Sequence, residues 1–154
     1  MYSREESKKL KEAFWTSFGR FMSPIPNDEG IKINWVNYKT GIKYLYFRME
    51  ADNRSATIYI EISQPDDGLR ELLFAQFQEY RSLLHAELEE EWHWDARYYD
   101  VYGKATARIG IHFPGKISIF KEADWPDLIS FFKPRIIALD RFWNSAKYGF
   151  ELFK

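Results

Sequence analysis

Apolar side chains recur at spacings of three and four along residues 4–22, and this period predicts an amphipathic helix. Ser3 followed by Glu6 has the spacing of a capping box, which satisfies free backbone N–H groups at a helix start. Residues 23–30 contain two prolines, an asparagine and a glycine. We therefore expect the helix to end there and a loop to follow.

From Ile31 onward the alternation of apolar and polar residues changes to a period of two. Three such runs cover residues 31–36, 45–49 and 56–62, separated by the turn signal Thr40–Gly41 and by a short polar link. Runs of this kind predict three strands of an antiparallel meander. The alternation assigns these side chains to the core: Ile31, Ile33, Leu45, Phe47, Ile58 and Ile60.

The remainder of the chain repeats this arrangement. Residues 65–90 carry a helical stripe of leucine and phenylalanine, and the strand pattern returns over 92–99, 105–113 and 116–120. Asp124 and Pro126 then begin a last helix that runs towards Phe150. Pro134 lies inside that helix, so we expect a kink or a break into two helices there, because proline removes a backbone donor and clashes with the preceding turn.

The predicted element order is α-βββ-α-βββ-α. Strands joined mostly by tight turns favour an antiparallel or mixed sheet with helices packed on one face, so we predict the α+β class. A length of 154 residues is that of one domain, and we assign residues 1–154 to a single domain.

Composition narrows the possible functions. The chain has no cysteine, which excludes a disulfide framework, a thiolate metal site and a cysteine nucleophile. The first residues are polar and of mixed charge, unlike a signal peptide, and no apolar run is long enough to span a membrane. We therefore expect a cytoplasmic protein with no membrane partner. The net charge of −1 is unevenly distributed, because the middle of the chain, residues 61–100, is acidic. We interpret this segment as a solvated helix face.

No catalytic or phosphate-binding motif is present, and we interpret the three histidines as structural. We expect no catalytic residue, no metal and no cofactor. One enzymatic alternative remains, because the opening order α-βββ-α-β is also that of nuclease-like folds that bind Mg²⁺ through strand carboxylates. The chain offers Glu50, Asp52 and Glu61 for this role, but Ser63 stands where such enzymes place a lysine.

The outer face of the first three strands is the strongest candidate for binding. Residues 31–48 contain four cations, several tyrosines and no acid. Rings that stack on bases and cations that neutralise phosphates are the parts of a strand-based nucleic-acid platform. A small aromatic ligand, a protein partner, or a solvated sheet face without any ligand fits the same pattern. The candidate binding face consists of Lys32, Asn34, Lys43, Tyr44, Tyr46, Arg48, Tyr59 and Glu61.

The last helix suggests a different kind of partner. Large aromatic side chains lie on both sides of Pro134 and form a packing surface. Aromatic residues are enriched at subunit interfaces, so this helix is a candidate for a homodimer contact. The aromatic residues concerned are Phe131, Phe132, Phe142 and Trp143.

Several short motifs together resemble a known bacterial family, domain of unknown function 4268 (DUF4268), and specifically its stand-alone members. The resemblance covers nearly the whole chain and rests on these pieces: residues 2–6, 14–19, 54–60, 74–77, Trp94 with Arg97, 107–109, 124–128 and 141–143. None of these motifs is catalytic in character. Some relatives carry the domain behind nuclease-like or other DNA-related modules, so the resemblance implies an accessory, non-catalytic role near DNA or in bacterial defence.

Overall fold

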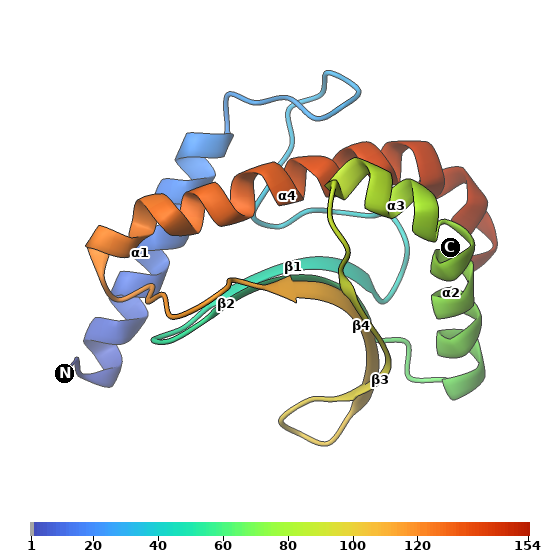
Figure 1. The fold of residues 1–154 in the computed structure, drawn as a ribbon, viewed down its shortest axis with the longest axis horizontal. Helices are drawn as coiled ribbons and strands as arrows, with labels where there is room; N and C mark the ends of the chain where they lie inside the picture. Colours follow the sequence, from blue (N-terminus) through green and yellow to red (C-terminus); the bar gives the residue numbers. More distant parts are fainter. Residues whose placement is uncertain (1) are drawn as a thin grey trace.

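The computed structural model describes residues 2–154 and has the element order α-ββ-αα-ββ-α (Figure 1). The elements are α1 (Arg4–Met22), β1 (Leu45–Ala51), β2 (Ala56–Ile62), α2 (Asp67–Glu79), α3 (Arg81–Leu88), β3 (His93–Tyr99), β4 (Ala105–His112), the 3₁₀ turn η1 (Glu122–Asp124), α4 (Trp125–Ala146) and the 3₁₀ segment η2 (Lys147–Phe153). The predicted capping box is present, since the Ser3 hydroxyl accepts from the Glu6 N–H. Among residues 2–154, none of the helices combines the length and the apolar character needed to cross a bilayer.

All four strands form one antiparallel sheet in the order β1-β2-β4-β3. The chain leaves the sheet after β2, forms α2 and α3, and returns as the β3–β4 hairpin, whose second strand pairs with β2. The predicted α+β class and the antiparallel sheet are therefore confirmed. The helix α4 crosses one face of the sheet, the inner face; within residues 2–154 no helix crosses the other, which we call the outer face (Figure 1).

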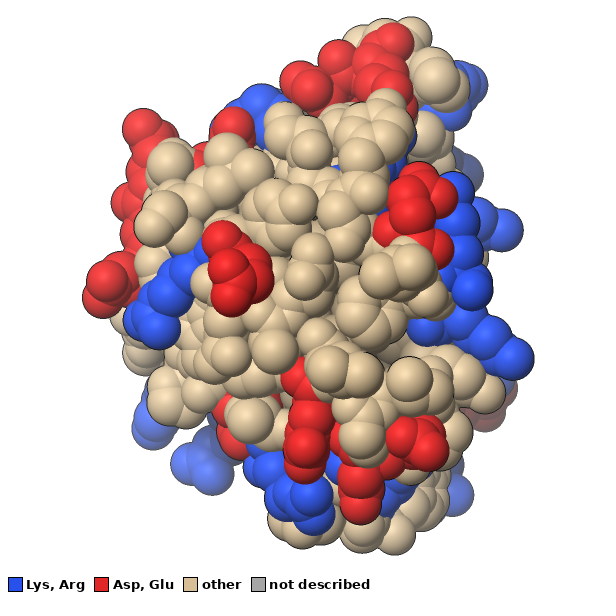
Figure 2. Space-filling model, turned by 90° about the vertical axis from the view of Figure 1, so that its right-hand side faces the viewer, with Lys and Arg blue, Asp and Glu red and all other residues tan. Residues whose placement is uncertain are grey.

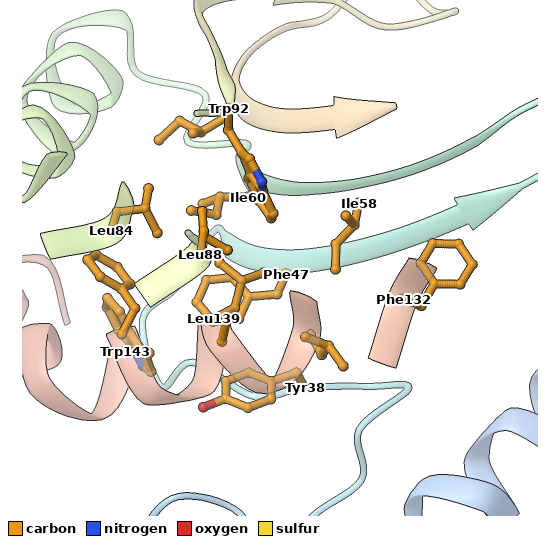
Figure 3. Close-up of a cluster of buried hydrophobic side chains, with 14 of the residues drawn as sticks. Tyr38, Phe47, Ile58, Ile60, Leu84, Leu88, Trp92, Phe132, Leu139 and Trp143 are labelled. Atoms are coloured by element: carbon orange, nitrogen blue, oxygen red, sulfur yellow. The ribbon is translucent and has the colours of Figure 1, made fainter. Parts of the chain in front are cut away.

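The core lies between the sheet and α4. Phe47, Ile58 and Ile60 point from the strands towards Leu139 and Trp143 of the helix, and all five are buried (Figure 3). Full burial of such a side chain contributes about 1.5–3 kcal/mol relative to an exposed one. This stripe of large apolar residues fixes which face of each strand is inner, and hence which side chains reach the outer face.

The helix α4 continues without interruption from Trp125 to Ala146, so of the kink or break predicted at Pro134, the break into two helices is wrong. Pro134 lacks the N–H that would close one helical hydrogen bond. The Arg135 guanidinium donates to the Phe131 carbonyl at 2.9 Å and gives this stretch an additional bond. Because Phe132 and Leu139, on either side of the proline, are fully buried, packing on the core holds the helix together.

Residues 31–36 do not form the predicted strand; residues 23–44 contain neither helix nor strand. Asparagine side chains bind the backbone here instead. The Asn34 carboxamide oxygen accepts from the N–H groups of Val36 and Asn37, both at 3.1 Å, and Asn27 accepts from that of Ile31. Such local bonds compete with a strand ladder. As a result Ile31, expected in the core, is 56% exposed.

Two further expectations need correction. Residues 116–120 do not form the predicted strand. Ile117 and Ile119 are nevertheless buried, and their backbone N–H groups donate to the carbonyls of Arg54 and Asp52, respectively.

The single helix predicted over 65–90 is two helices. At Tyr80 the backbone leaves the helical conformation (φ −102°, ψ 14°), and α3 begins at the next residue.

Candidate functional site

Register and alternation bring three cross-strand rows to the outer face. The first row contains Tyr46, Glu61, Arg108 and Asp95; the second contains Arg48, Tyr59, Gly110 and His93; the third contains Glu50, Thr57 and His112. Because adjacent residues within a row are close cross-strand neighbours, the side chains of these rows share one surface. The outer face therefore has a defined layer of rings, cations and carboxylates.

Arg108 lies at the centre of this layer, between two tyrosine rings. Its guanidinium carbon is 4.1 Å from the centroid of the Tyr59 ring and 3.8 Å from that of Tyr98. One guanidinium nitrogen is 3.9 Å from the Glu61 carboxylate, and Nε is buried without a hydrogen-bond partner among the described residues. Cation–π contacts contribute about 0.5–2 kcal/mol each, so the two rings hold the Arg108 guanidinium in place on the outer face.

Tyr59 is only 2% exposed although it belongs to the outer face. The Arg108 guanidinium covers its ring, and its hydroxyl donates to a Glu50 carboxylate oxygen at 2.5 Å. Burial, together with this hydrogen bond, raises the pKa of Tyr59 above its ordinary value. The hydrogen bond from the Tyr59 phenol fixes the Glu50 carboxylate in place.

Arg48 forms a second cation–ring pair beside the first. Its guanidinium carbon is 4.1 Å from the centroid of Tyr46, and its Nε donates to Glu61 at 3.3 Å. Glu61 thus bridges Arg48 and Arg108. Exposed ion pairs contribute little stability, typically about 0–1 kcal/mol. Their main effect here is to orient two guanidinium groups on one surface.

A hollow of about 300 Å³ opens next to Arg108. Its lining consists of Thr57, Tyr59, His93, Asp95, Tyr98, Arg108, Gly110 and His112. The His112 ring nitrogen Nδ1 is 2.7 Å from the Thr57 hydroxyl. A Cβ atom at Gly110 would lie 2.4 Å from the Tyr59 Cβ and 2.8 Å from the Ile58 carbonyl oxygen, so only glycine fits the observed backbone.

The β3–β4 hairpin extends this surface beyond the sheet. It projects below the sheet, on the side away from α4 (Figure 1). Tyr98 is 37% exposed, and Tyr102, at the turn, is 92% exposed. Lys104 is exposed, and it lies an even number of residues before Arg108, as residues on the same face of a strand do. Asp100, the one acid in residues 96–108, accepts two backbone N–H groups within the turn.

The structure brings together only half of the candidate binding face derived from the sequence. Tyr46, Arg48, Tyr59 and Glu61 lie on the outer face as described above. The remaining four candidates lie elsewhere: Lys32 and Asn34 in the loop 23–44, and Lys43 and Tyr44 just before β1, beside Leu69 and Leu152. The acid-free stretch 31–48 therefore does not form one surface, because its first part is not a strand.

The second hairpin contributes residues to the outer face that the sequence pattern did not predict. Arg108, Tyr98 and Gly110 complete the layer that β1 and β2 begin. A local signal existed, since Arg108, Gly110 and His112 alternate with buried Ala107 and Ile109. The local pattern could not predict that β4 pairs with β2, and this pairing places Arg108 opposite Glu61.

The three carboxylates of the nuclease-like alternative make separate contacts. Glu50 binds Tyr59, and Glu61 binds the two arginines. The Asp52 carboxylate accepts from the N–H groups of Arg54 and Ser55 in the β1–β2 turn. Burial alone would raise the pKa of Asp52, but these bonds outweigh it and lower the pKa. Within residues 2–154, no three His, Asp or Glu side chains are grouped so as to hold a metal ion.

The aromatic residues proposed for a dimer contact are part of the core. Phe131, Phe132, Phe142 and Trp143 are all buried within the chain. Exposed apolar side chains gather instead on the side formed by α2 and η2, where the surface is broadly uncharged with charges towards its edges (Figure 2). The exposed residues there are Leu69, Leu72, Tyr148 and Leu152.

These features define an α+β protein with a four-stranded antiparallel sheet, helices on one face, and a layer of rings and charges on the other. The chain belongs to the family described as Domain of unknown function (DUF4268), which matches residues 10–147. No curated protein and no solved structure is detectably similar to it.

Proposed function

We propose that this protein is a non-catalytic binding domain that holds single-stranded nucleic acid on the outer face of its sheet. The observation that carries the proposal is the Arg108 guanidinium fixed between Tyr59 and Tyr98 on a sheet face that no helix of the described chain covers. Single strands offer unpaired bases that stack on rings and phosphates that pair with cations. The outer face and the hairpin present both kinds of group to the same ligand.

The arrangement of the groups suggests how a strand would lie. The hollow beside Arg108 has room for one base, with His93 and His112 at its rim. The exposed rings of Tyr98 and Tyr102 continue from the hollow along the hairpin and offer stacking surfaces for further bases. Base stacking on an aromatic ring contributes about 1–3 kcal/mol per base. Arg48, Arg108 and Lys104 supply cations for the phosphates.

The carboxylates on the face are compatible with this role because they are already engaged. Glu61 is shared by the two arginines, and Glu50 accepts from Tyr59. Asp95, the third acid of the face, accepts the backbone N–H of Arg97 at 3.1 Å. A phosphate that approaches Arg108 competes with a weak 3.9 Å ion pair rather than a strong one. Displacing a weak pair of this kind costs little.

Binding is expected to depend on salt in a defined way. Each phosphate neutralised on a single strand contributes about −0.7 to the slope of log affinity against log salt, so three cations predict a slope of about −2. Fluorescence anisotropy with a labelled oligothymidine of about 12 nucleotides, titrated from about 20 to about 200 mM KCl, measures this slope. A duplex of equal length should bind more weakly because its bases are already stacked. Absence of binding at the lowest salt would refute the proposal.

A further inference from the structure

A second, separate site is suggested by the loop 23–44, which lies against the C-terminal half of α4. Loops longer than about 12–15 residues without helix or strand are uncommon in compact domains and are usually functional. This loop is also held in one conformation. Its Asn27 and Asn34 side chains bind its own backbone, and Gly30 and Gly41 adopt positive φ angles of 78° and 82°.

A buried carboxylate fixes the loop to α4. Asp140 is 1% exposed and forms no ion pair among residues 2–154. It accepts the Tyr38 hydroxyl at 2.5 Å, the Asp28 N–H at 2.7 Å and the Asn144 amide at 3.2 Å. Three donors from two elements compensate the buried charge. The loop is therefore tied to the helix at a specific position.

Between the anchored loop and α4 lies a cavity of about 320 Å³. Ligand cavities in proteins are typically about 300–1,000 Å³. Its walls include the ring of Trp143, which belongs to α4, the ring of Tyr38, which lies beside α4 in Figure 3, and the side chain of Ile33. The polar atoms of both rings are already engaged, since Trp143 donates to the Thr40 carbonyl and Tyr38 to Asp140. Both rings are almost fully buried, with Tyr38 8% and Trp143 2% exposed, so what they contribute to the cavity wall is a small apolar area.

The polar groups that line the cavity are mostly donors. Asn27 and Asn34 use their carboxamide oxygens to hold the loop, so their amide N–H groups remain for a ligand. The side chain of Lys39 lines the cavity and has no ion-pair or hydrogen-bond partner within the described chain. Glu29 is the one acid in the lining, and Lys147 donates to it at 3.1 Å. Among the lining residues, two lysines and one glutamate leave one positive charge in excess. The Asp140 carboxylate next to the cavity is already bound by three donors.

We propose that this cavity binds a small planar molecule that carries an anionic group. The rings of Tyr38 and Trp143 suit a flat aromatic or heteroaromatic body, and Lys39 with the asparagine amides suits a phosphate or carboxylate. The site is distinct from the outer face, since the two share no lining residue. A nucleoside monophosphate and an aromatic carboxylate have the same two chemical features, and the experiment distinguishes them.

NMR titration of the ¹⁵N-labelled full chain tests the proposal with three probes: adenosine monophosphate, 4-hydroxybenzoate and adenosine. We expect one of the two anionic probes to shift the Trp143 indole N–H signal and the backbone amides of residues 34–40 in a saturable manner. Adenosine lacks the anion and should bind at least about tenfold more weakly than its monophosphate if the nucleotide is the ligand class. If 4-hydroxybenzoate alone shifts these signals, the ligand class is an aromatic carboxylate.

The matched variants are Lys39→Glu at the cavity and Lys8→Glu on α1, both at exposed positions. Lys39→Glu should weaken binding of the active probe at least about tenfold because it places a second carboxylate near the anion. Lys8→Glu makes the same change in net charge and should leave binding unchanged. The proposal is overturned if neither anionic probe shifts these signals at millimolar concentration, if the shifts map to another surface, or if Lys39→Glu binds as tightly as the unchanged protein.

Discussion

Reversing two cations of the outer face, by Arg48→Glu combined with Lys104→Glu, is expected to weaken single-strand binding about 100-fold at low salt. Arg48 lies over Tyr46 on β1, and Lys104 lies at the hairpin turn, so the two positions are at opposite ends of the proposed path. Each change removes a phosphate contact and adds a repulsive charge. The salt slope should also become shallower by about 1.4, which is the contribution of two phosphates.

A control for this variant must change net charge equally at another site. Lys8→Glu with Lys9→Glu does so on α1, where both lysines are exposed and only Lys9 has an ion-pair partner, Glu5, at 3.9 Å. We expect this control to retain affinity within a few-fold. Circular dichroism melting of both variants shows whether each is folded. Equal losses of affinity in the two folded variants would mean that net charge, not the outer face, determines binding.

Replacing Gly110 with valine is expected to lower the free energy of unfolding by about 3 kcal/mol or more. A Cβ at this position would lie 2.4 Å from the Tyr59 Cβ and 2.8 Å from the Ile58 carbonyl oxygen. Neither atom can move without displacing β2, which is the central partner of β4. Urea denaturation followed by circular dichroism measures the loss.

His112→Val is the matched comparison, because residue 112 is the next outer-facing position on β4. His112 is exposed, and valine has high strand propensity, so we expect a change of less than about 1 kcal/mol. A Gly110→Val variant as stable as His112→Val would show that the backbones of β2 and β4 do not approach as closely as described.

Alternation of apolar and polar residues was sufficient to predict β1, β2 and β4. Phe47, Ile58 and Ile60 were assigned to the core from sequence and are buried there. Their neighbours Tyr46 and Arg48 were assigned to the opposite face, and the structure places them there. Because a side-chain period of two is an intrinsic property of a strand, it can be read without tertiary information.

The same reasoning failed for residues 31–36, where the alternation is equally regular. The side chains of Asn27 and Asn34 bind the backbone in this region and replace strand hydrogen bonds. Whether an asparagine side chain binds the backbone depends on the local backbone geometry, which the pattern of apolar and polar residues does not reveal. The missed loop matters for function, because it moves Lys32 and Asn34 away from the sheet and forms the wall of a separate cavity.

The centre of the candidate site could not be predicted because it depends on pairing between distant strands. Arg108 reaches Tyr59 only because β4 lies beside β2, with two helices and β3 between them in the chain. Local periodicity does not specify strand order. Tyr59 illustrates the consequence: it was expected on an open face, and it is on that face, but the Arg108 guanidinium covers its ring.

Photo-crosslinking tests the central claim most directly, because exposed tyrosines occur both on the proposed surface and away from it. Tyr46 belongs to β1, and Tyr98 and Tyr102 belong to the β3–β4 hairpin, whereas Tyr2 precedes α1 and Tyr148 lies in η2. A single strand containing 5-bromouracil, irradiated in complex with the protein and analysed by mass spectrometry, should crosslink to the first group. Crosslinks confined to Tyr2 or Tyr148, or to the loop 23–44, would contradict the account.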